Sequence, residues 1–158
     1  MLEWLLNNAK TMTIGDVMTK SVIAVDASST INEASKMMED AKVGAIIVIE
    51  NNIPIGIVTD RDFTVKVVAH AYNISTSIKQ IMSAPLISVN SNESVRVAAE
   101  LMHEYKVRKL PVMENEQVVG MITATDIVNL LAVCVEEDTR DMYFHSMVKI
   151  FSNYSPYN

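Results

Sequence analysis

Cysteine, long apolar runs and basic charge are all scarce in this 158-residue sequence. The single thiol, Cys134, excludes an internal disulfide framework, which fits a reducing cytosol. No stretch approaches the ~18 consecutive apolar residues that cross a membrane, and the short N-terminal apolar run contains Glu3, which is not typical of a secretory signal. The formal charge of −6 argues against a nucleic-acid partner, because nucleic-acid-binding surfaces are usually basic. We therefore expect a cytoplasmic protein with neither a membrane nor a nucleic-acid partner.

Catalytic and metal-binding patterns are missing as well. His70, His103 and His145 are isolated, with no cysteine or carboxylate at metal-ligand spacing, so we interpret them as surface or internally satisfied side chains. Cys134 lies in an apolar helical run and is expected to be buried and inert. No nucleophile elbow, Walker loop or glycine-rich dinucleotide fingerprint is present. The sequence predicts no catalytic residue, no metal and no enzymatic activity.

An internal repeat dominates what is present. A shift of 64 positions lays residues 14–62 over residues 78–126 without a gap, and 14 of the 49 aligned positions are identical. Such repeats fix the architecture before any other signal. We predict a first repeat over 13–73 and a second over 74–135, with an N-terminal helix within 1–12 and a C-terminal helix and tail over 136–158.

Each repeat follows one plan: an opening helical turn, then a β-α-β-β-α series. The first repeat is expected to place these elements at 14–18, 22–25, 31–41, 45–49, 53–58 and 61–71, and the second at 78–82, 86–89, 95–105, 110–113, 118–122 and 125–135. The helices show apolar residues at helical spacing, and the run that follows Gly44 is apolar on both faces, as in a buried strand. The fold class is therefore α/β (α+β), with two repeats facing each other across a pseudo-two-fold axis and framing two crevices.

The C-terminal segment lies outside the repeat. Tyr143, Met147, Ile150 and Phe151 predict one apolar helix face. Two interpretations stay open for this face. It either packs on the flank of its own chain or forms a helix between subunits.

The strongest short pattern is G-x-x-T-x-x-D, found at the end of each hairpin as residues 56–62 and 120–126. Thr59 and Thr123 end a strand where a helix begins, and the free N–H groups of a helix start favour anions. Asp62 and Asp126 lie one turn into the helix, where a carboxylate could accept bonds from sugar hydroxyls. The competing interpretation is a capping box, in which the aspartate only bonds back to the threonine.

A second pattern distinguishes the repeats. Gly44 and Ala45 open the middle strand of the first repeat, where the second has Arg108 and Lys109. Small residues would let a flat base approach, and two cations would suit phosphate, although such a pair can also be a solvated edge. Arg61 is a third candidate phosphate ligand, or else a surface charge paired with Asp60; the second repeat has Thr125 at the position of Arg61.

These features together resemble a tandem pair of CBS domains, a Bateman module. The resemblance covers about residues 13–135 and includes the opening motifs at 17–19 and 81–83 and the segment 107–112. It implies a regulatory ligand that contains adenosine, either AMP, ADP, ATP or S-adenosylmethionine, bound in clefts between the repeats, with no other cofactor required. It also implies a homodimer.

The resemblance implies roles for particular residues. Asp62 and Asp126 would bind ribose, and Thr59 and Thr123 would lie on the phosphate side. Arg108 and Lys109 would contact phosphate, from where they could reach a ligand at Asp62 across the pseudo-axis. The adenine slot of the first repeat would be lined by Val22, Ile23, Gly44, Ala45 and Ile46. Arg61, Leu110 and Thr125 complete the candidate ligand-binding set.

The sequence therefore predicts a stand-alone sensor that binds an adenosine-containing ligand and signals to a partner protein. Because the two repeats differ at these positions, their crevices should differ in affinity, and one could be empty. The alternative is a structural dimerisation module without a ligand, since apolar Ile46, Ile47 and Leu110 near the expected crevices could occlude them.

Overall fold

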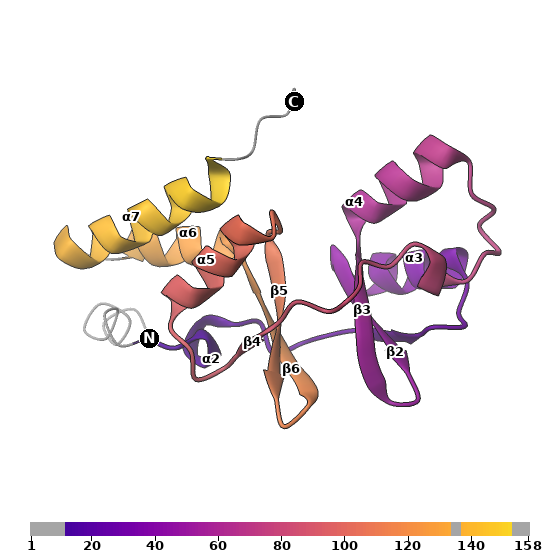
Figure 1. The fold of residues 1–158 in the computed structure, drawn as a ribbon, viewed down its shortest axis with the longest axis horizontal. Coiled ribbons are helices and arrows are strands. Elements are labelled where there is room, and N and C mark those ends of the chain that lie inside the picture. The colour runs from indigo at the N-terminus through magenta and orange to yellow at the C-terminus, as the bar shows by residue number, and fades with distance from the viewer. Residues whose placement is uncertain (1–11, 134–136, 153–158) are drawn as a thin grey trace. The chain divides into compact units, whose positions relative to one another are not determined.

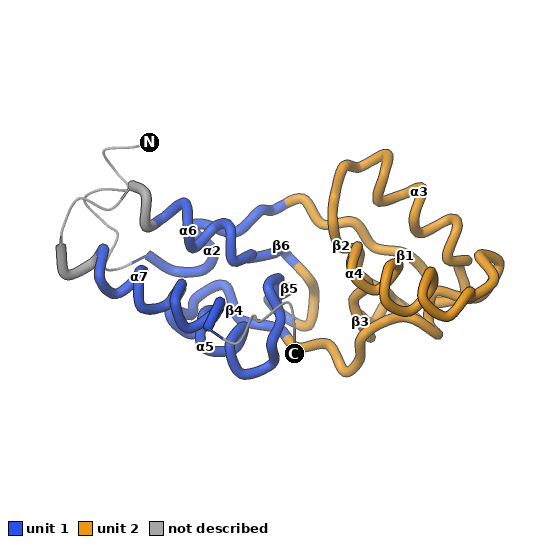
Figure 2. The backbone as a smooth tube through the Cα atoms, turned by 90° about the horizontal axis from the view of Figure 1, so that it is seen from above, with its two compact units in different colours: residues 1–20, 88–115, 119–158 blue, residues 21–87, 116–118 orange. Residues whose placement is uncertain are grey.

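A computed structural model describes residues 12–133 and 137–152, which form a mixed α/β fold with two three-stranded sheets (Figure 1). The predicted N-terminal helix, apart from Met12, lies outside the described residues, as do Cys134, Glu136 and the tail from 153 onward. The chain divides into two compact units, which Figure 2 distinguishes by colour. Unit 1 comprises residues 1–20, 88–115 and 119–158, and unit 2 comprises residues 21–87 and 116–118.

Unit 2 is built on the first repeat. Its elements are β1 (Ala24–Asp26), α3 (Ile31–Ala41), β2 (Ala45–Glu50), β3 (Ile53–Thr59), α4 (Asp60–Asp62), the π-helical η1 (Phe63–Val68) and the 3-10 helix η2 (Ile78–Gln80). β1 runs parallel to β2, and β2 pairs with β3 in antiparallel orientation. The α3 helix begins at a capping box formed by Thr30 and Glu33, which fixes its first turn.

Unit 1 repeats this arrangement with the second repeat. Its elements are α2 (Ile14–Val17), β4 (Val89–Asn90), α5 (Val95–Glu104), β5 (Lys109–Glu114), β6 (Gln117–Thr123, of which the first two residues belong to unit 2), α6 (Ala124–Val133) and α7 (Glu137–Phe151). β4 pairs with β5 in parallel, and the strand order is β4-β5-β6. The C-terminal helix predicted beyond the repeat is thus observed as α7, and it packs on α5 and α6 of its own unit.

The opening segment of each repeat joins the compact unit of the other repeat. Thr19 of the first repeat forms a bridge with Met121 on β6, and both hydrogen bonds of this bridge are 2.9 Å long. Ser83 of the second repeat forms the equivalent bridge with Ile57 on β3. The compact units are therefore not the same as the linear repeats.

The core of unit 2 explains this exchange. A buried apolar cluster gathers side chains of β1, α3, β2, β3 and η1 together with Ile78 and Ile81 from the opening of the second repeat. Both of these isoleucines are fully buried. Because burial of an isoleucine side chain contributes about 2 kcal/mol, the exchanged segment stabilises the unit that receives it.

Some elements differ from the sequence-based expectation. Helix 31–41 has its predicted bounds, whereas the first strands begin later, at Ala24 and Val89. The helix that follows β3 is π-helical over Phe63–Val68, in a run rich in β-branched residues that pack poorly in an α-helix. On α7, Tyr143 and Ile150 are buried as predicted, but Phe151 is exposed.

Candidate functional site

The two strand-to-helix junctions that carry the G-x-x-T-x-x-D pattern have the same local geometry. At the first junction (Thr59–Asp62), Asp62 Oδ2 accepts hydrogen bonds from the backbone N–H of Thr59 at 2.8 Å and from its hydroxyl at 2.7 Å. At the second junction (Thr123–Asp126), both corresponding distances, to Asp126 Oδ2, are 2.7 Å. Each aspartate is therefore held in one orientation by the threonine at the end of the preceding strand.

The capping-box interpretation is confirmed at the level of hydrogen bonds. The chain uses the same device at Thr13 with Asp16 and at Thr30 with Glu33, both at helix starts outside the G-x-x-T-x-x-D pattern. A threonine followed three residues later by an acidic residue is thus a folding device throughout this chain. An aspartate that can bind a ligand therefore differs from one that only caps a helix in the hydrogen-bond partners of its second carboxylate oxygen.

The start of each middle strand lies beside its own junction. In unit 2, Ala45 is the register partner of Thr59, and the Asp60 N–H donates to the Gly44 carbonyl at 3.3 Å. In unit 1, the Ala124 N–H donates to the Arg108 carbonyl at 2.9 Å. The structure thus brings Gly44 and Ala45 next to the first junction, and Arg108 with the first residue of β5, Lys109, next to the second.

The remaining predicted residues differ in accessibility. Ile46 and Leu110 are fully buried, so both contribute to the cores of their units. Val22 and Ile23 precede β1 and are half-buried; the Ile23 carbonyl accepts from Ile47 N–H at 2.9 Å. The two residues just before the aspartates, Arg61 and Thr125, are exposed.

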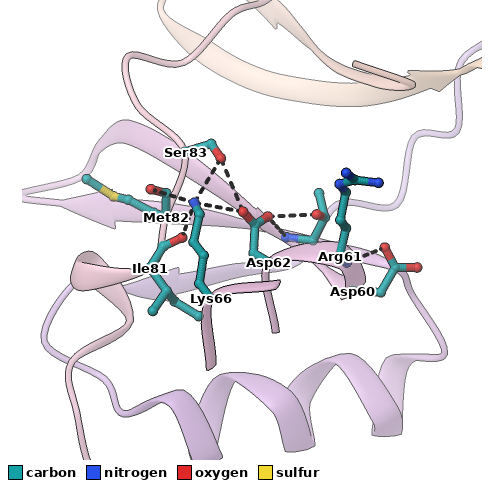
Figure 3. Close-up of polar contacts among 8 residues, drawn as sticks. Asp60, Arg61, Asp62, Lys66, Ile81, Met82 and Ser83 are labelled. Carbon is teal, nitrogen blue, oxygen red and sulfur yellow. Dashed lines mark hydrogen bonds and ion pairs between the residues drawn. The ribbon is translucent and has the colours of Figure 1, made fainter. Parts of the chain in front are cut away.

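The surroundings of Asp62 include residues that the sequence-based set missed (Figure 3). Lys66, one turn further along the helix, forms an ion pair with Asp62 Oδ1 at 2.8 Å. The same ammonium donates to the Ile81 carbonyl at 2.7 Å and to the Ser83 hydroxyl at 3.3 Å. The Ser83 hydroxyl also donates to Asp62 Oδ1 at 3.3 Å. Lys66 therefore ties the Asp62 carboxylate to the opening segment of the second repeat.

These contacts determine the ionisation state of Asp62, which is only 8% exposed. Burial raises the pKa of the Asp62 carboxyl, but the hydrogen bonds from Lys66 and Thr59 and the charge of Lys66 outweigh burial. The net pKa lies below its usual 3.8, so the carboxylate is ionised at neutral pH.

A signal for Lys66 is present in the sequence, in the difference between repeats. At the 64-residue offset, Lys66 aligns with the apolar Leu130. A lysine at a position that is apolar in the other copy suggests a contact specific to one repeat. Its partners in residues 81–83 could not be identified without the tertiary structure.

The glycine of the pattern has a packing role. A Cβ added at Gly56 would lie 2.9 Å from the Ser83 carbonyl oxygen and 2.8 Å from Met82 Sδ. A Cβ added at Gly120 would lie 3.0 Å from the carbonyl oxygen of Thr19 and also clash with Met18. Glycine is needed at both positions because the exchanged Met-Ser and Met-Thr segments lie directly against the strand.

Other candidate chemistry finds no support in the part of the chain that the structure describes. Residues 12–133 and 137–152 contain no cluster of three or more histidine, cysteine or acidic side chains that could hold a metal ion. His145 Nδ1 contacts the Asp141 carbonyl at 2.7 Å, and His103 Nδ1 contacts the Lys149 carbonyl. Every helix within these ranges is too short or too polar to cross a bilayer.

Comparison with known proteins identifies relatives over most of the chain. The CBS domain family matches residues 14–68 and 78–133. The CBS domain-containing protein YhcV of Bacillus subtilis (strain 168) is 34% identical over 114 residues, which are 72% of this chain and 81% of that protein. The inosine-5′-monophosphate dehydrogenase of Korarchaeum cryptofilum (strain OPF8) is 33% identical over 109 residues, which are 68% of this chain but only 22% of the enzyme.

Solved structures agree with this result. The CBS domain pair of protein MJ0100, in complex with 5′-methylthioadenosine and S-adenosyl-L-methionine, has a TM-score of 0.70 at 25% identity. The similarity covers 77% of this chain and 97% of that chain. The chain therefore belongs to the CBS domain family and carries the domain twice, as a CBS pair regulatory module.

Proposed function

We propose that this CBS pair binds an adenosine-containing ligand at its strand-to-helix junctions and passes the bound state to a partner protein. The ligand class is AMP, ADP, ATP or S-adenosylmethionine. The observation that carries the proposal is the orientation of Asp126: Thr123 holds one carboxylate oxygen, and the other has no hydrogen-bond partner among the described residues. A carboxylate fixed in this way can accept bonds from a ribose diol. The adenosine ligands of the MJ0100 pair support the same class.

A thermal-shift assay tests this function. A ligand at 100 times its dissociation constant adds about 2.7 kcal/mol to the free energy of unfolding. For a chain of this size, that corresponds to a rise in Tm of about 5 to 10 °C. We expect such a rise with at least one of AMP, ADP, ATP and S-adenosylmethionine, and a smaller one with GMP as the matched control. No rise with any of the four at millimolar concentration contradicts the proposal.

A second candidate function is a structural dimerisation module without a ligand. It is favoured by the complete burial of Ile46 and Leu110 and by the intrachain bonds that occupy Asp62. On this alternative, substituting Asp126 by alanine leaves binding of the partner protein and the response to nucleotides unchanged. The nucleotide-sensor proposal expects the ligand-induced rise in Tm to be lost in Asp126→Ala.

We also propose that the chain forms a homodimer through α7. One face of this helix, with Tyr143 and Ile150, is buried against α5 and α6, whereas Phe144, Val148 and Phe151 are exposed. The exposed three are spaced i, i+4, i+7, so they form a second apolar stripe. Symmetric dimers are common among soluble proteins.

A further inference from the structure

We infer that Asp60, Lys66 and Ser83 occupy the first junction in place of a ligand, which leaves the second junction as the primary site for the adenosine-containing ligand. This inference rests on the proposed function and names which of the two aspartates performs it. Lys66 is the residue that determines the difference between the two carboxylates. The two junctions differ in their carboxylates, in the neighbouring amides and in the flanking charges.

The Asp62 carboxylate is saturated with donors. A carboxylate has two oxygens and about four lone-pair positions. Both positions on Oδ2 are used by Thr59, and those on Oδ1 are used by the Lys66 ammonium at 2.8 Å and the Ser83 hydroxyl at 3.3 Å (Figure 3). A ribose hydroxyl can bond to Asp62 only after one of these donors has moved away.

The Asp126 carboxylate has room for the same hydroxyl. Its Oδ2 is held by Thr123, and no partner of Oδ1 is found within residues 12–133 and 137–152. Asp126 is half-buried, whereas Asp62 is buried. The two lone pairs of Oδ1 are therefore available to a diol at the second junction and occupied at the first.

The backbone amides at the two junctions also favour the second junction as the ligand site. At the first junction, the Asp60 carboxylate accepts from the Arg61 N–H at 2.9 Å, so this amide is already used within the chain. The corresponding residue of the second repeat is Ala124, which has neither an acceptor nor a charge in its side chain. A phosphate at the second junction meets no intrachain anion at this position.

The flanking charges also favour the second junction for an anionic ligand. Arg108 and Lys109 lie beside it, at the start of β5, where the first repeat has two uncharged residues. At the first junction, Lys66 forms an ion pair with Asp62. Lys66 also donates to the Ile81 carbonyl. Moving the Lys66 ammonium away from Asp62 would therefore disturb this hydrogen bond to the opening segment of the second repeat.

The sequence explains why only one junction is self-occupied. At the 64-residue offset, Lys66 aligns with Leu130 and Ser83 aligns with Thr19. Leu130 is buried and cannot donate to a carboxylate. The second repeat thus keeps the threonine–aspartate capping box. It lacks the lysine ammonium that pairs with the second carboxylate oxygen in the first repeat.

Isothermal titration with AMP, ADP, ATP and S-adenosylmethionine, each titrated separately, tests the inference. We expect the wild-type chain to bind one equivalent of at least one of these ligands. Asp126→Asn should weaken that equivalent about tenfold or more, as expected when hydroxyls lose bonds to an ionised carboxylate. The double variant Asp60→Ala, Lys66→Met should bind a second equivalent. Lys79→Met, which removes another paired lysine of the same unit, is the control and should bind as the wild type does.

The outcomes separate the inference from the proposed function. Three outcomes overturn the inference and leave the sensor function intact. They are two equal equivalents in the wild type, an unchanged affinity in Asp126→Asn, and a single equivalent in a folded double variant. Circular dichroism and Tm establish that the double variant is folded. If it is not folded, Ser83→Ala, which frees one lone pair of Asp62, must show the second equivalent. Absence of binding by every protein overturns both proposals.

Discussion

The Asp62 carboxylate belongs to two networks, since one of its oxygens completes a capping box and the other holds Lys66. Its net pKa is lowered, because these bonds outweigh the burial that raises it. A carboxyl group whose folded-state pKa lies below the unfolded value of about 3.8 stabilises the fold at pH values above the unfolded pKa. This contribution is lost as the pH falls through the lower, folded-state value.

Substituting Asp62 by asparagine should therefore reduce the free energy of unfolding in a pH-dependent way. At pH 7 we expect a loss of about 2 kcal/mol, the scale of a hydrogen bond to a charged group. The difference between wild type and variant should shrink as the pH is lowered from about 5 toward 3. Urea denaturation at pH 7, 5 and 3 measures it, with Asp40→Asn, at an exposed position, as the control. A difference that stays constant over this range contradicts the assignment.

Single residues show which parts of the site a sequence can reveal. The threonine–aspartate spacing predicted the junctions, because a capping box depends only on residues three apart. Lys66 was missed, because its bonds to residues 81–83 span 15 residues or more and have no periodic signature. Ile46 and Leu110 were predicted to line a site; both are fully buried, and their contact with a ligand stays a prediction.

At the scale of elements, strong local signals gave accurate bounds. Helix α3 has a capping box and the buried apolar positions Ile31, Ala34 and Met38, so the 31–41 prediction is confirmed. The opening strands proved shorter than predicted, since their register with the middle strands begins only at Ala24 and Val89. The exchange of opening segments was not predicted, because it joins each segment to the third strand of the other repeat.

The close contact between β3 and the exchanged segment predicts the effect of Gly56→Ala. The new Cβ would approach the Ser83 carbonyl oxygen to 2.9 Å, and a backbone atom cannot rotate away as a side chain can. We expect a loss of about 2 kcal/mol in the free energy of unfolding, typical of overpacking. Chemical denaturation measures it. Gly15→Ala is the matched control and should cost less, since its nearest neighbour lies at 3.3 Å. Equal stability of the two variants would exclude the packing role of Gly56.

At the scale of the whole molecule, the sequence predicted a repeated α/β chain with a further C-terminal helix, and both are observed. Self-similarity over 49 ungapped positions carries more information than any single element, which is why the architecture was predictable. The two interpretations left open for the C-terminal helix, packing on its own chain or contact between subunits, apply to different faces of α7. Packing on its own unit is observed for the face with Tyr143, and the opposite face carries the proposal of a homodimer.

Val148→Glu tests this second face of α7. Val148 is 46% exposed and lies between Phe144 and Phe151 on the stripe, so a buried charge at the dimer contact should raise the dissociation constant about tenfold or more. Sedimentation velocity over a concentration series measures the monomer–dimer equilibrium. Lys149→Glu changes the charge of the adjacent exposed position by more than Val148→Glu does, yet lies off the apolar stripe, and should weaken the dimer less. A monomeric wild type, or a Val148→Glu protein that dimerises as well as the wild type, rules out α7 as the interface.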